Sequence, residues 1–409
     1  MLNAEVKFEF SIHFSIQPSA FSIAVRILYC AIDQTVPGTT GGSVHVTAVA
    51  EGLAALGHEV HVLVTPGDGP FPSGPSSNPV RWIPMAPPLG AKQLRWMRIG
   101  EVRRIVGVLQ PAVVIERYYN FGGEGVMAAA EARARTVLEV NAPVIDHEGS
   151  AKGRIDRALI VEPMRRWRER ICARADLIVT PSSAILPRDT PSRKIVRLEW
   201  GADTDRFRPD VTGTPPFERP ATTVAIFAGA FRRWHGAVNL VRAMHDLHSR
   251  GRSDVGAVLV GDGPELSAVQ DEAADLPNIV FTGAVPHTHM PMCLAAADIG
   301  VAPFEIGAHR PLSLGFYWSP LKIFEYMAAG LPVVAPAVDR LPSIVADGRE
   351  GLLYDPSHPG ALAEALETLS DPTLRRPLGR AARERAVTEY SWKAHCVALD
   401  RAIKNLRIG

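Results

Sequence analysis

The 409-residue sequence has few cysteines, no long apolar run and almost no net charge, and each absence argues against a class of protein. Its four cysteines are scattered without a Cys-x-x-Cys pair, which argues against a disulfide framework or a zinc site. A formal net charge of +1 gives no electrostatic reason to expect a nucleic-acid partner. No run of about 18 apolar residues is present, so no transmembrane helix is predicted. The scattered cysteines suit a reducing compartment, and the expected location is the cytoplasm.

The Gly-x-Gly-x-x-Gly spacing of a dinucleotide-binding turn is also missing from both halves, which argues against a nicotinamide dehydrogenase. Short apolar runs instead alternate with helical patterns, a rhythm typical of parallel α/β sheets. Strands are predicted at residues 25–30, 60–64, 113–116, 137–140 and 177–180, and again at 223–227, 255–260, 279–282, 299–303 and 333–335. Two such series predict two domains.

The stretch from residue 317 to residue 336 predicts a loop, a short helix and a buried strand. Ser319 is expected to cap a helix whose first residue is Pro320. Lys322 lies where a capping box has an acid, and a cation there opposes the helix dipole at a cost of about 0.3–1 kcal/mol. An anion at the same helix end would offset this cost. Lys322 and the N–H groups of residues 319–321 therefore predict a phosphate site.

Glu325 lies three residues after Lys322 on the same helix face. A carboxylate there is placed to accept hydrogen bonds from sugar hydroxyls, so phosphate and diol together outline a nucleotide sugar. The alternative interpretation is a surface lysine with its ammonium in water and a solvated glutamate.

The same stretch reads Ser-Pro-Leu-Lys-Ile-Phe-Glu-Tyr-Met-Ala-Ala-Gly-Leu-Pro-Val-Val-Ala, and it resembles the donor-binding signature of the retaining glycosyltransferases of family 4. The resemblance implies the GT-B fold, in which two Rossmann-like α/β domains with parallel sheets face a cleft. It also implies a hexosyltransferase-like enzyme that needs no metal and no cofactor. Such an enzyme moves a sugar, with retention, from a nucleoside-diphosphate sugar to a glycan, lipid-linked or small-molecule acceptor.

The resemblance divides the chain into four parts. Residues 1–24 are an extension of uncertain order, 25–205 an N-terminal acceptor domain, 206–385 a nucleotide-sugar donor domain, and 386–409 a helix that returns to the first domain. The boundary contains Asp203-x-Asp205, which resembles the interdomain turn of the family and is not interpreted as a metal site.

The loop after the strand at 223–227 carries two arginines ahead of a helix, an arrangement that suits a diphosphate. Family members usually have an arginine and a lysine at the positions of Ala230 and His235, so the charge is expected to have moved to Arg232 or Arg233. The residues implied to be catalytic are Lys322, Glu325, Arg232 and Arg233. The residues implied to bind the donor are Gly41, Gly42, His235, Gly283, Val285, Ser319, Pro320 and Leu321.

On the N-terminal side, Gly41 and Gly42 lie in a glycine-rich loop after the first strand, where they let the backbone approach a phosphate or sugar closely. The alternative is a plain turn, but the resemblance implies that the pair faces the donor. Asn141 and His147 follow the strand at 137–140, in the region where the family contacts its acceptor.

One departure from the family pattern concerns the first of two glutamates that usually lie near the donor sugar. It falls on Tyr317 here, and the substitutes nearest in sequence are Glu305, His309 and Arg310. Two alternatives therefore stay open. One is a catalytically weak sugar-nucleotide binding protein in a larger assembly, and the other is a sugar-nucleotide epimerase on the same fold.

Residues 152–174 hold eight basic and three acidic side chains, with Met164 and Trp167 between them. A basic helix with an aromatic residue suits an anionic membrane surface, whereas the alternative is a solvated helix face. If the acceptor is lipid-linked, this segment is the predicted site of peripheral membrane contact.

Overall fold

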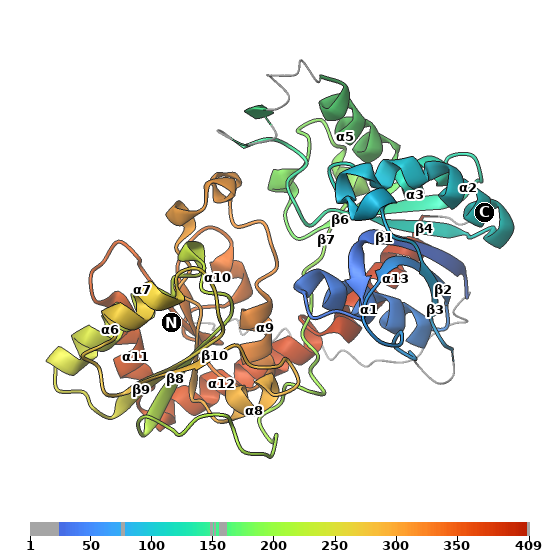
Figure 1. Cartoon of the computed structure of the whole chain (residues 1–409). Coiled ribbons are helices and arrows are strands. Elements are labelled where there is room, and N and C mark those ends of the chain that lie inside the picture. The colour runs from blue at the N-terminus through green and yellow to red at the C-terminus, as the bar shows by residue number, and fades with distance from the viewer. Residues whose placement is uncertain (1–23, 75–77, 148–149, 151–152, 155–161, 407–409) are drawn as a thin grey trace, which may run out of the picture.

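The computed structural model describes residues 24–74, 78–147, 150, 153–154 and 162–406. The predicted extension lies outside these residues except for residue 24, and so does part of the predicted basic segment, residues 152 and 155–161. The described chain forms two α/β units, each built on one parallel sheet (Figure 1).

The first sheet has seven parallel strands in the order β3-β2-β1-β4-β5-β6-β7. Their bounds are β1 Arg26–Val36, β2 Glu59–Pro66, β3 Arg81–Pro84, β4 Val113–Arg117, β5 Arg135–Glu139, β6 Leu177–Thr180 and β7 Ile195–Arg197. Alternate residues of β1 enter different cores. Ile27 and Tyr29 pack with α1 (Gly41–Ala55) and α13 (Trp392–Lys404), while Leu28 and Cys30 pack with α2 (Ile99–Leu109) and α3 (Glu124–Ala129). The helix α5 (Glu162–Arg174) lies beside α3.

The second sheet has six parallel strands in the order β10-β9-β8-β11-β12-β13. Their bounds are β8 Thr223–Ala228, β9 Val255–Val260, β10 Ile279–Gly283, β11 Ile299–Val301, β12 Val333–Pro336 and β13 Gly351–Tyr354. One core holds α6 (Ala237–Ser249), α7 (Leu266–Glu272) and α11 (Ala361–Leu369), and another holds α8 (Met290–Ala295), α9 (Leu321–Ala328), α10 (Leu341–Ile344) and α12 (Pro372–Thr388). Short 3₁₀ turns are η1 Pro88–Gly90, η2 Lys92–Arg98, η3 Ser183–Ile185, η4 Ser192–Lys194, η5 Arg233–His235, η6 Ile306–Ala308 and η7 Arg310–Leu314.

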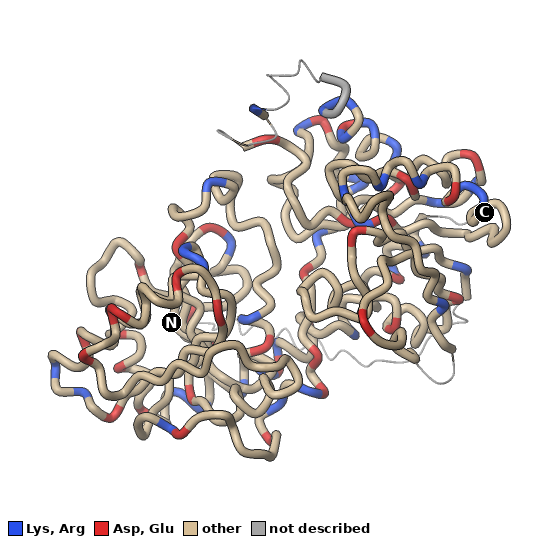
Figure 2. Tube along the Cα trace, in the orientation of Figure 1, with Lys and Arg blue, Asp and Glu red and all other residues tan. Residues whose placement is uncertain are grey.

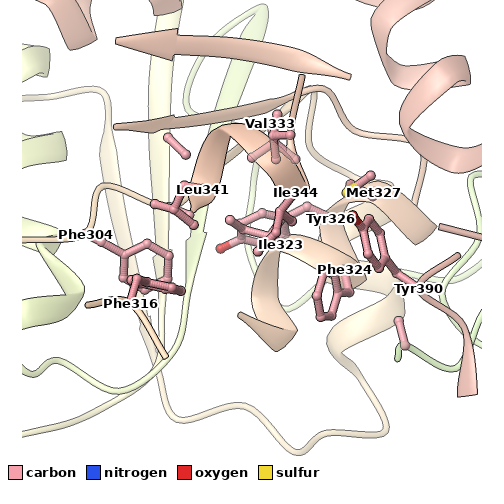
Figure 3. Packing of buried hydrophobic residues seen from close by; sticks show 14 of the residues in the cluster. Phe304, Phe316, Ile323, Phe324, Tyr326, Met327, Val333, Leu341, Ile344 and Tyr390 are labelled. Carbon is pink, nitrogen blue, oxygen red and sulfur yellow. The ribbon is translucent and has the colours of Figure 1, made fainter. Parts of the chain in front are cut away.

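Helix α9 is fixed by aromatic packing on its buried side (Figure 3). The Phe324 ring stacks on Tyr390 with centroids 4.6 Å apart, and the Tyr326 hydroxyl accepts from the Ala228 N–H at 2.7 Å. The Tyr326 ring fills the space beside Gly300, where an added Cβ would lie 2.5 Å from it. This packing on the buried side of α9 therefore fixes the position of the side chains on its opposite face.

The last described helix, α13, packs against α1 of the first unit, as the red α13 beside the blue α1 shows (Figure 1). The crossover after β7 is held to this last segment, because Ala202 N–H donates to the Tyr390 carbonyl at 2.7 Å. The Cys396 side chain packs on α1 beside Gly52. The expected fold class of two parallel α/β units is confirmed.

Candidate functional site

A cleft of about 670 Å³ separates the two units, a volume suited to a small-molecule ligand. The first unit contributes Thr39, Gly41 and Val44 from the start of α1. The second unit contributes the loops after β8, β9 and β10 together with the start of α9. Ligands of open α/β sheets bind at the carboxyl ends of their strands, and those ends are what the cleft joins.

Lys322 closes one wall of this cleft with an ammonium that has no hydrogen-bond partner among the described residues. Its Nζ lies 4.2 Å from the ring centroid of Phe227 and 5.3 Å from that of Phe304. Burial lowers the pKa of Lys322 to about 7, although the charge of Glu325 acts in the opposite direction. A buried, unpaired cation is costly, so this site favours an anionic ligand.

Gly229 makes room for that ligand at the end of β8. A Cβ added there would lie 2.9 Å from the Lys322 Nζ, and the residue has a positive φ of 148°. Both observations require glycine, which is the one residue that leaves the space beside the ammonium open.

His235 faces the same space with a neutral imidazole. Its Nδ1 lies 2.6 Å from the Ala230 carbonyl oxygen, and because that oxygen only accepts, Nδ1 carries the hydrogen. Burial, and then the charge of Lys322, lower the pKa of His235 to about 3. The other ring nitrogen, Nε2, is therefore left as an acceptor.

Arg232 and Arg233 lie in the loop that follows β8. They line a separate groove of about 630 Å³ together with Arg242 and Arg310, and neither lines the cleft. The Arg232 guanidinium lies 5.3 Å from the Trp234 ring centroid, and its charge also acts on His235. The expectation that Arg232 or Arg233 reaches the diphosphate beside Lys322 therefore stays a prediction.

The start of α9 also differs from the expectation. Pro320 is the N-cap, and Ser319 does not cap the helix. The Ser319 hydroxyl instead donates to Glu199 at 2.7 Å and accepts from the Trp200 N–H at 2.9 Å. Ser319, Pro320 and Leu321 nevertheless line the cleft as expected.

Glu325 lines the cleft beside a histidine that the sequence analysis missed. The His287 Nε2 lies 3.4 Å from the Glu325 Oε1, and both residues face the space above α9. Arg206 donates to the His287 carbonyl at 3.0 Å and fixes the loop. The available signal was the position of His287 after β10, at the carboxyl end of a strand. Of the two predicted residues in this loop, Val285 lines the cleft and Gly283 does not.

Tyr317, at the position of the first motif glutamate, belongs to the hydrophobic core. Its side chain is 8% exposed, and burial raises its pKa to about 12. Glu305 lines the separate groove and accepts from Asn239 at 3.4 Å, so it does not supply a carboxylate to the cleft. His309 stacks on Trp234 with centroids 4.1 Å apart.

On the first unit, Gly41 and Gly42 form the first turn of α1 and not a loop, with Thr40 as the cap. Gly41 lines the cleft, and a Cβ added there would lie 3.5 Å from Leu321 of the other unit. A Cβ at Gly42 would meet the side-chain amide of Gln34 inside the first unit.

Of the two predicted acceptor residues, Asn141 contacts the crossover and His147 lies within electrostatic reach of His309 in the second unit. The Asn141 Oδ1 accepts from the Trp200 indole at 2.9 Å, while its Nδ2 is buried without a partner among the described residues. His147 acts electrostatically across the gap on His309, whose pKa is lowered first by burial and then by His147.

Beneath Trp200 lies a buried acid–base pair that the sequence analysis did not identify. The Glu139 carboxylate accepts from the Tyr29 hydroxyl at 2.5 Å and lies 3.2 Å from the His45 Nε2. These contacts outweigh burial and lower the pKa of Glu139 to about 2. The His45 ring in turn lies 4.5 Å from Trp200, so the pair supports the crossover from below.

Two further findings concern the described part of the chain only. No helix there has the length and apolar character needed to cross a bilayer. No group of three or more His, Cys, Asp or Glu side chains there converges as metal ligands would.

Comparison with known families gives two matches that follow one another along the chain. Residues 39–206 match the model described as Glycosyltransferase Family 4, and residues 222–371 match the model described as Glycosyl transferases group 1. The first region includes β2 to β7 of the first sheet, and the second includes all six strands of the second sheet.

Two curated relatives come from Mycolicibacterium smegmatis. A GDP-mannose-dependent alpha-(1-6)-phosphatidylinositol monomannoside mannosyltransferase is 29% identical over 228 residues, which are 53% of this chain and 58% of the relative. An alpha-maltose-1-phosphate synthase is 34% identical over 185 residues, or 41% of this chain and 44% of the relative. The chain thus spans about half the length of the curated relatives it matches.

Among solved structures, sucrose-phosphate synthase from Thermosynechococcus elongatus superposes with a TM-score of 0.63 at 18% identity, covering 93% of this chain and 99% of that one. The Anabaena HepE protein in complex with UDP gives a TM-score of 0.65 at 17% identity, with coverage of 93% and 100%. At these identities the likeness shows the fold, which is GT-B.

Proposed function

Since the chain belongs to the group 1, family 4 glycosyltransferases, we propose that it moves a sugar from a nucleoside-diphosphate sugar to an acceptor held by the first unit. The observation that carries this proposal is the buried ammonium of Lys322, which has no partner among the described residues and faces a cleft between the units. The printed names of relatives support the donor class, because one is GDP-mannose-dependent and a similar fold holds UDP.

The chemistry assigned to the cleft is cleavage of the bond between the anomeric carbon and the diphosphate. The bonding electron pair leaves with the diphosphate oxygen, whose charge Lys322 stabilises. The acceptor oxygen forms the new bond, and its proton passes to the departing diphosphate. We assign retention at the anomeric carbon on the strength of the family, and no protein base is required.

The sugar itself is assigned to the space between Glu325 and His235. The Glu325 carboxylate accepts from two hydroxyls, and the free His235 Nε2 accepts from a third. Because neither group is a cation, the sugar binds without competing for the phosphate site. Asn141 and His147 are the assigned contacts of the acceptor, which is a glycan, a lipid-linked glycan or a small molecule. Four buried, free cysteines suit a reducing compartment such as the cytoplasm.

The proposal is tested by a thermal-shift screen of nucleoside diphosphates and their sugars. A ligand at about 100 times its dissociation constant adds roughly 2.7 kcal/mol to the free energy of unfolding, which such a screen detects. We expect Lys322→Ala to abolish the shift with every ligand, because it removes the phosphate charge. Glu325→Ala should abolish the part of the shift that the sugar adds to that of the nucleoside diphosphate, because it removes the sugar contact. The exposed lysine in Lys393→Ala provides the matched control, which keeps the full shift.

If both cleft variants retain the wild-type shift, the assignment of α9 to the donor is wrong. The core position of Tyr317 favours one alternative, a weakly catalytic sugar-nucleotide binding protein. Nucleotide release with an acceptor extract separates the two functions, since a binding protein shows the shift but releases no nucleotide. Interconversion of the donor sugar without acceptor would identify an epimerase instead.

A further inference from the structure

The surface formed by η1, η2 and α2, called the 88–109 surface below, exposes an unusual amount of apolar side chain. Of the seven large hydrophobic residues that are exposed in the described chain, four lie on or between these elements. They are Leu89, Trp96, Met97 and Val108, with exposed fractions of 97%, 46%, 54% and 83%. Single exposed apolar residues need no explanation, but a group within one short segment marks an interaction surface.

The usual burial of residue types is reversed in this segment, because the arginine is buried and the tryptophan is exposed. Arg95 is fully buried and pairs with Asp33 and Glu124, while Trp96 and Met97 point to solvent. The Trp96 N–H donates to the Phe121 carbonyl at 3.2 Å and fixes the backbone next to the ion pairs. Removing a partner from a buried ion pair costs several kcal/mol, so the segment cannot rotate its apolar side chains inward.

The exposed apolar residues share one face with basic side chains. Met97, Gly100, Arg104 and Val108 recur at three- and four-residue intervals, and all four are exposed. Arg104 has no ion-pair partner among the described residues, and Lys92 in η2 is likewise unpaired and exposed. The other charges of this surface compensate one another, since Arg98 pairs with Glu101 and Arg103 with Glu131.

The 88–109 surface begins near the carboxyl ends of the strands of the first sheet. Arg95 places it there, because its partner Asp33 lies in the last part of β1 and its partner Glu124 begins α3. Helix α5 belongs to the same layer through its contacts with α3, and it adds the exposed Arg170 and Arg174. Blue positions recur along α5 and α2 (Figure 2).

We propose that the 88–109 surface docks on an anionic lipid bilayer. Leu89, Trp96 and Met97 enter the interface between headgroups and acyl chains, where a tryptophan is especially favourable. Lys92 and Arg104 contact lipid phosphates, at a gain of about fivefold in affinity for each charge. A protein partner would favour a larger apolar patch that excludes water. Separate exposed apolar side chains beside unpaired cations instead suit the interface and the phosphates of an anionic membrane.

The test is flotation of the purified full-length protein with vesicles of equal parts phosphatidylglycerol and phosphatidylcholine, beside vesicles of phosphatidylcholine alone. We expect binding to the anionic vesicles that weakens with salt. Trp96→Ser with Met97→Ser should reduce it roughly tenfold or more, and Lys92→Glu with Arg104→Glu at least about fivefold per charge. Leu374→Ser is the matched control, since Leu374 is 50% exposed on α12 of the other unit and should leave binding unchanged.

No donor is present in this assay, so its outcome is independent of the proposed donor site. The thermal midpoint of each variant, with and without nucleotide, must equal that of the wild type, which shows that a loss of flotation is not a loss of folding. Failure of the wild type to float, or equal flotation on neutral vesicles, overturns the proposal. It is also overturned if the wild type is a dimer that Trp96→Ser with Met97→Ser dissociates, because the surface then belongs to a second copy of the chain.

Discussion

Lys322 is a buried cation whose ammonium has no hydrogen-bond partner among the described residues. Its pKa of about 7 lies well below the ordinary 10.5 because its ammonium is buried against Phe227 and Phe304. Between about pH 7 and pH 10.5 the unfolded chain binds more protons than the folded one at this site. The contribution of Lys322 to the free energy of unfolding therefore rises across this window, and its burial is most costly below pH 7.

Binding of a nucleoside-diphosphate sugar should reverse this shift. The diphosphate supplies the missing counter-charge, so the pKa of Lys322 rises and about half a proton is taken up at pH 7. We expect the affinity to fall by up to about tenfold per pH unit above pH 7, because the free protein must first be protonated. Calorimetric titration in buffers of different ionisation enthalpy measures the proton uptake, and the same titration repeated at several pH values measures the change in affinity.

Two variants separate this lysine from other titrating groups in the cleft. Lys322→Arg keeps a cation that stays charged at all these pH values, so its affinity should not change between pH 7 and 9. His235→Asn should keep the wild-type dependence, because a histidine with a pKa of about 3 takes up little proton in this range. A wild-type affinity that is constant across the same range would contradict the assignment of Lys322 as the phosphate ligand.

At the scale of elements, the turn before α9 is held by residues distant in sequence. Arg340 donates to the carbonyls of Phe316 and Trp318 and pairs with Glu199 of the crossover. Ser319 donates to the same carboxylate. The turn that precedes α9 and the segment that joins the two sheets are therefore fixed by one guanidinium.

Arg340→Lys should weaken donor binding without removing any group that touches the donor. A lysine cannot reproduce the planar fork, so two carbonyls lose their donor and the turn at residues 316–320 loosens. We expect the dissociation constant of the nucleotide to rise about tenfold and the free energy of unfolding to fall by about 1.5–3 kcal/mol. Titration and chemical denaturation measure the two effects. Arg208→Lys, at an exposed pair with Asp210, should change neither, and an unchanged nucleotide affinity in Arg340→Lys would refute this role.

The same elements show what the sequence predicts and what it does not. The ten predicted strands are present, whereas β3, β7 and β13 were missed, and all three lie at sheet edges. Edge strands are short and partly exposed, so their apolar pattern is weak. The start of α9 was predicted within one residue, but the role of Ser319 was not, because its partner Glu199 is 120 residues away. The placement of Arg232 and Arg233 depends on the direction of a turn, which composition does not determine.

At the scale of the whole molecule, α13 couples the unfolding of one unit to the unfolding of the other. It continues from α12 of the second unit and packs on α1 of the first. Its Ser391 and Trp392 meet the crossover at Ala202. A ligand that stabilises the second unit must therefore also oppose unfolding of the first, as long as α13 stays in place.

Gly52 is the position at which this coupling is open to test. It lies inside α1, and a Cβ added there would be 2.4 Å from the Cys396 sulfur of α13. Alanine in a helix is otherwise favoured over glycine by about 1 kcal/mol, so any loss reports the displaced α13. Gly107→Ala in α2, where an added Cβ meets nothing within 4 Å, should instead be neutral or stabilising.

We expect calorimetry of the wild type to show one unfolding transition that moves as a whole when a binding nucleotide is added. In Gly52→Ala it should split into two, because the first unit no longer shares α13 with the second. Only the transition of the second unit, which contains Lys322, should then respond to nucleotide. If Gly52→Ala unfolds in a single transition that still shifts fully with nucleotide, the coupling runs through the cleft walls and the crossover, and α13 does not carry it.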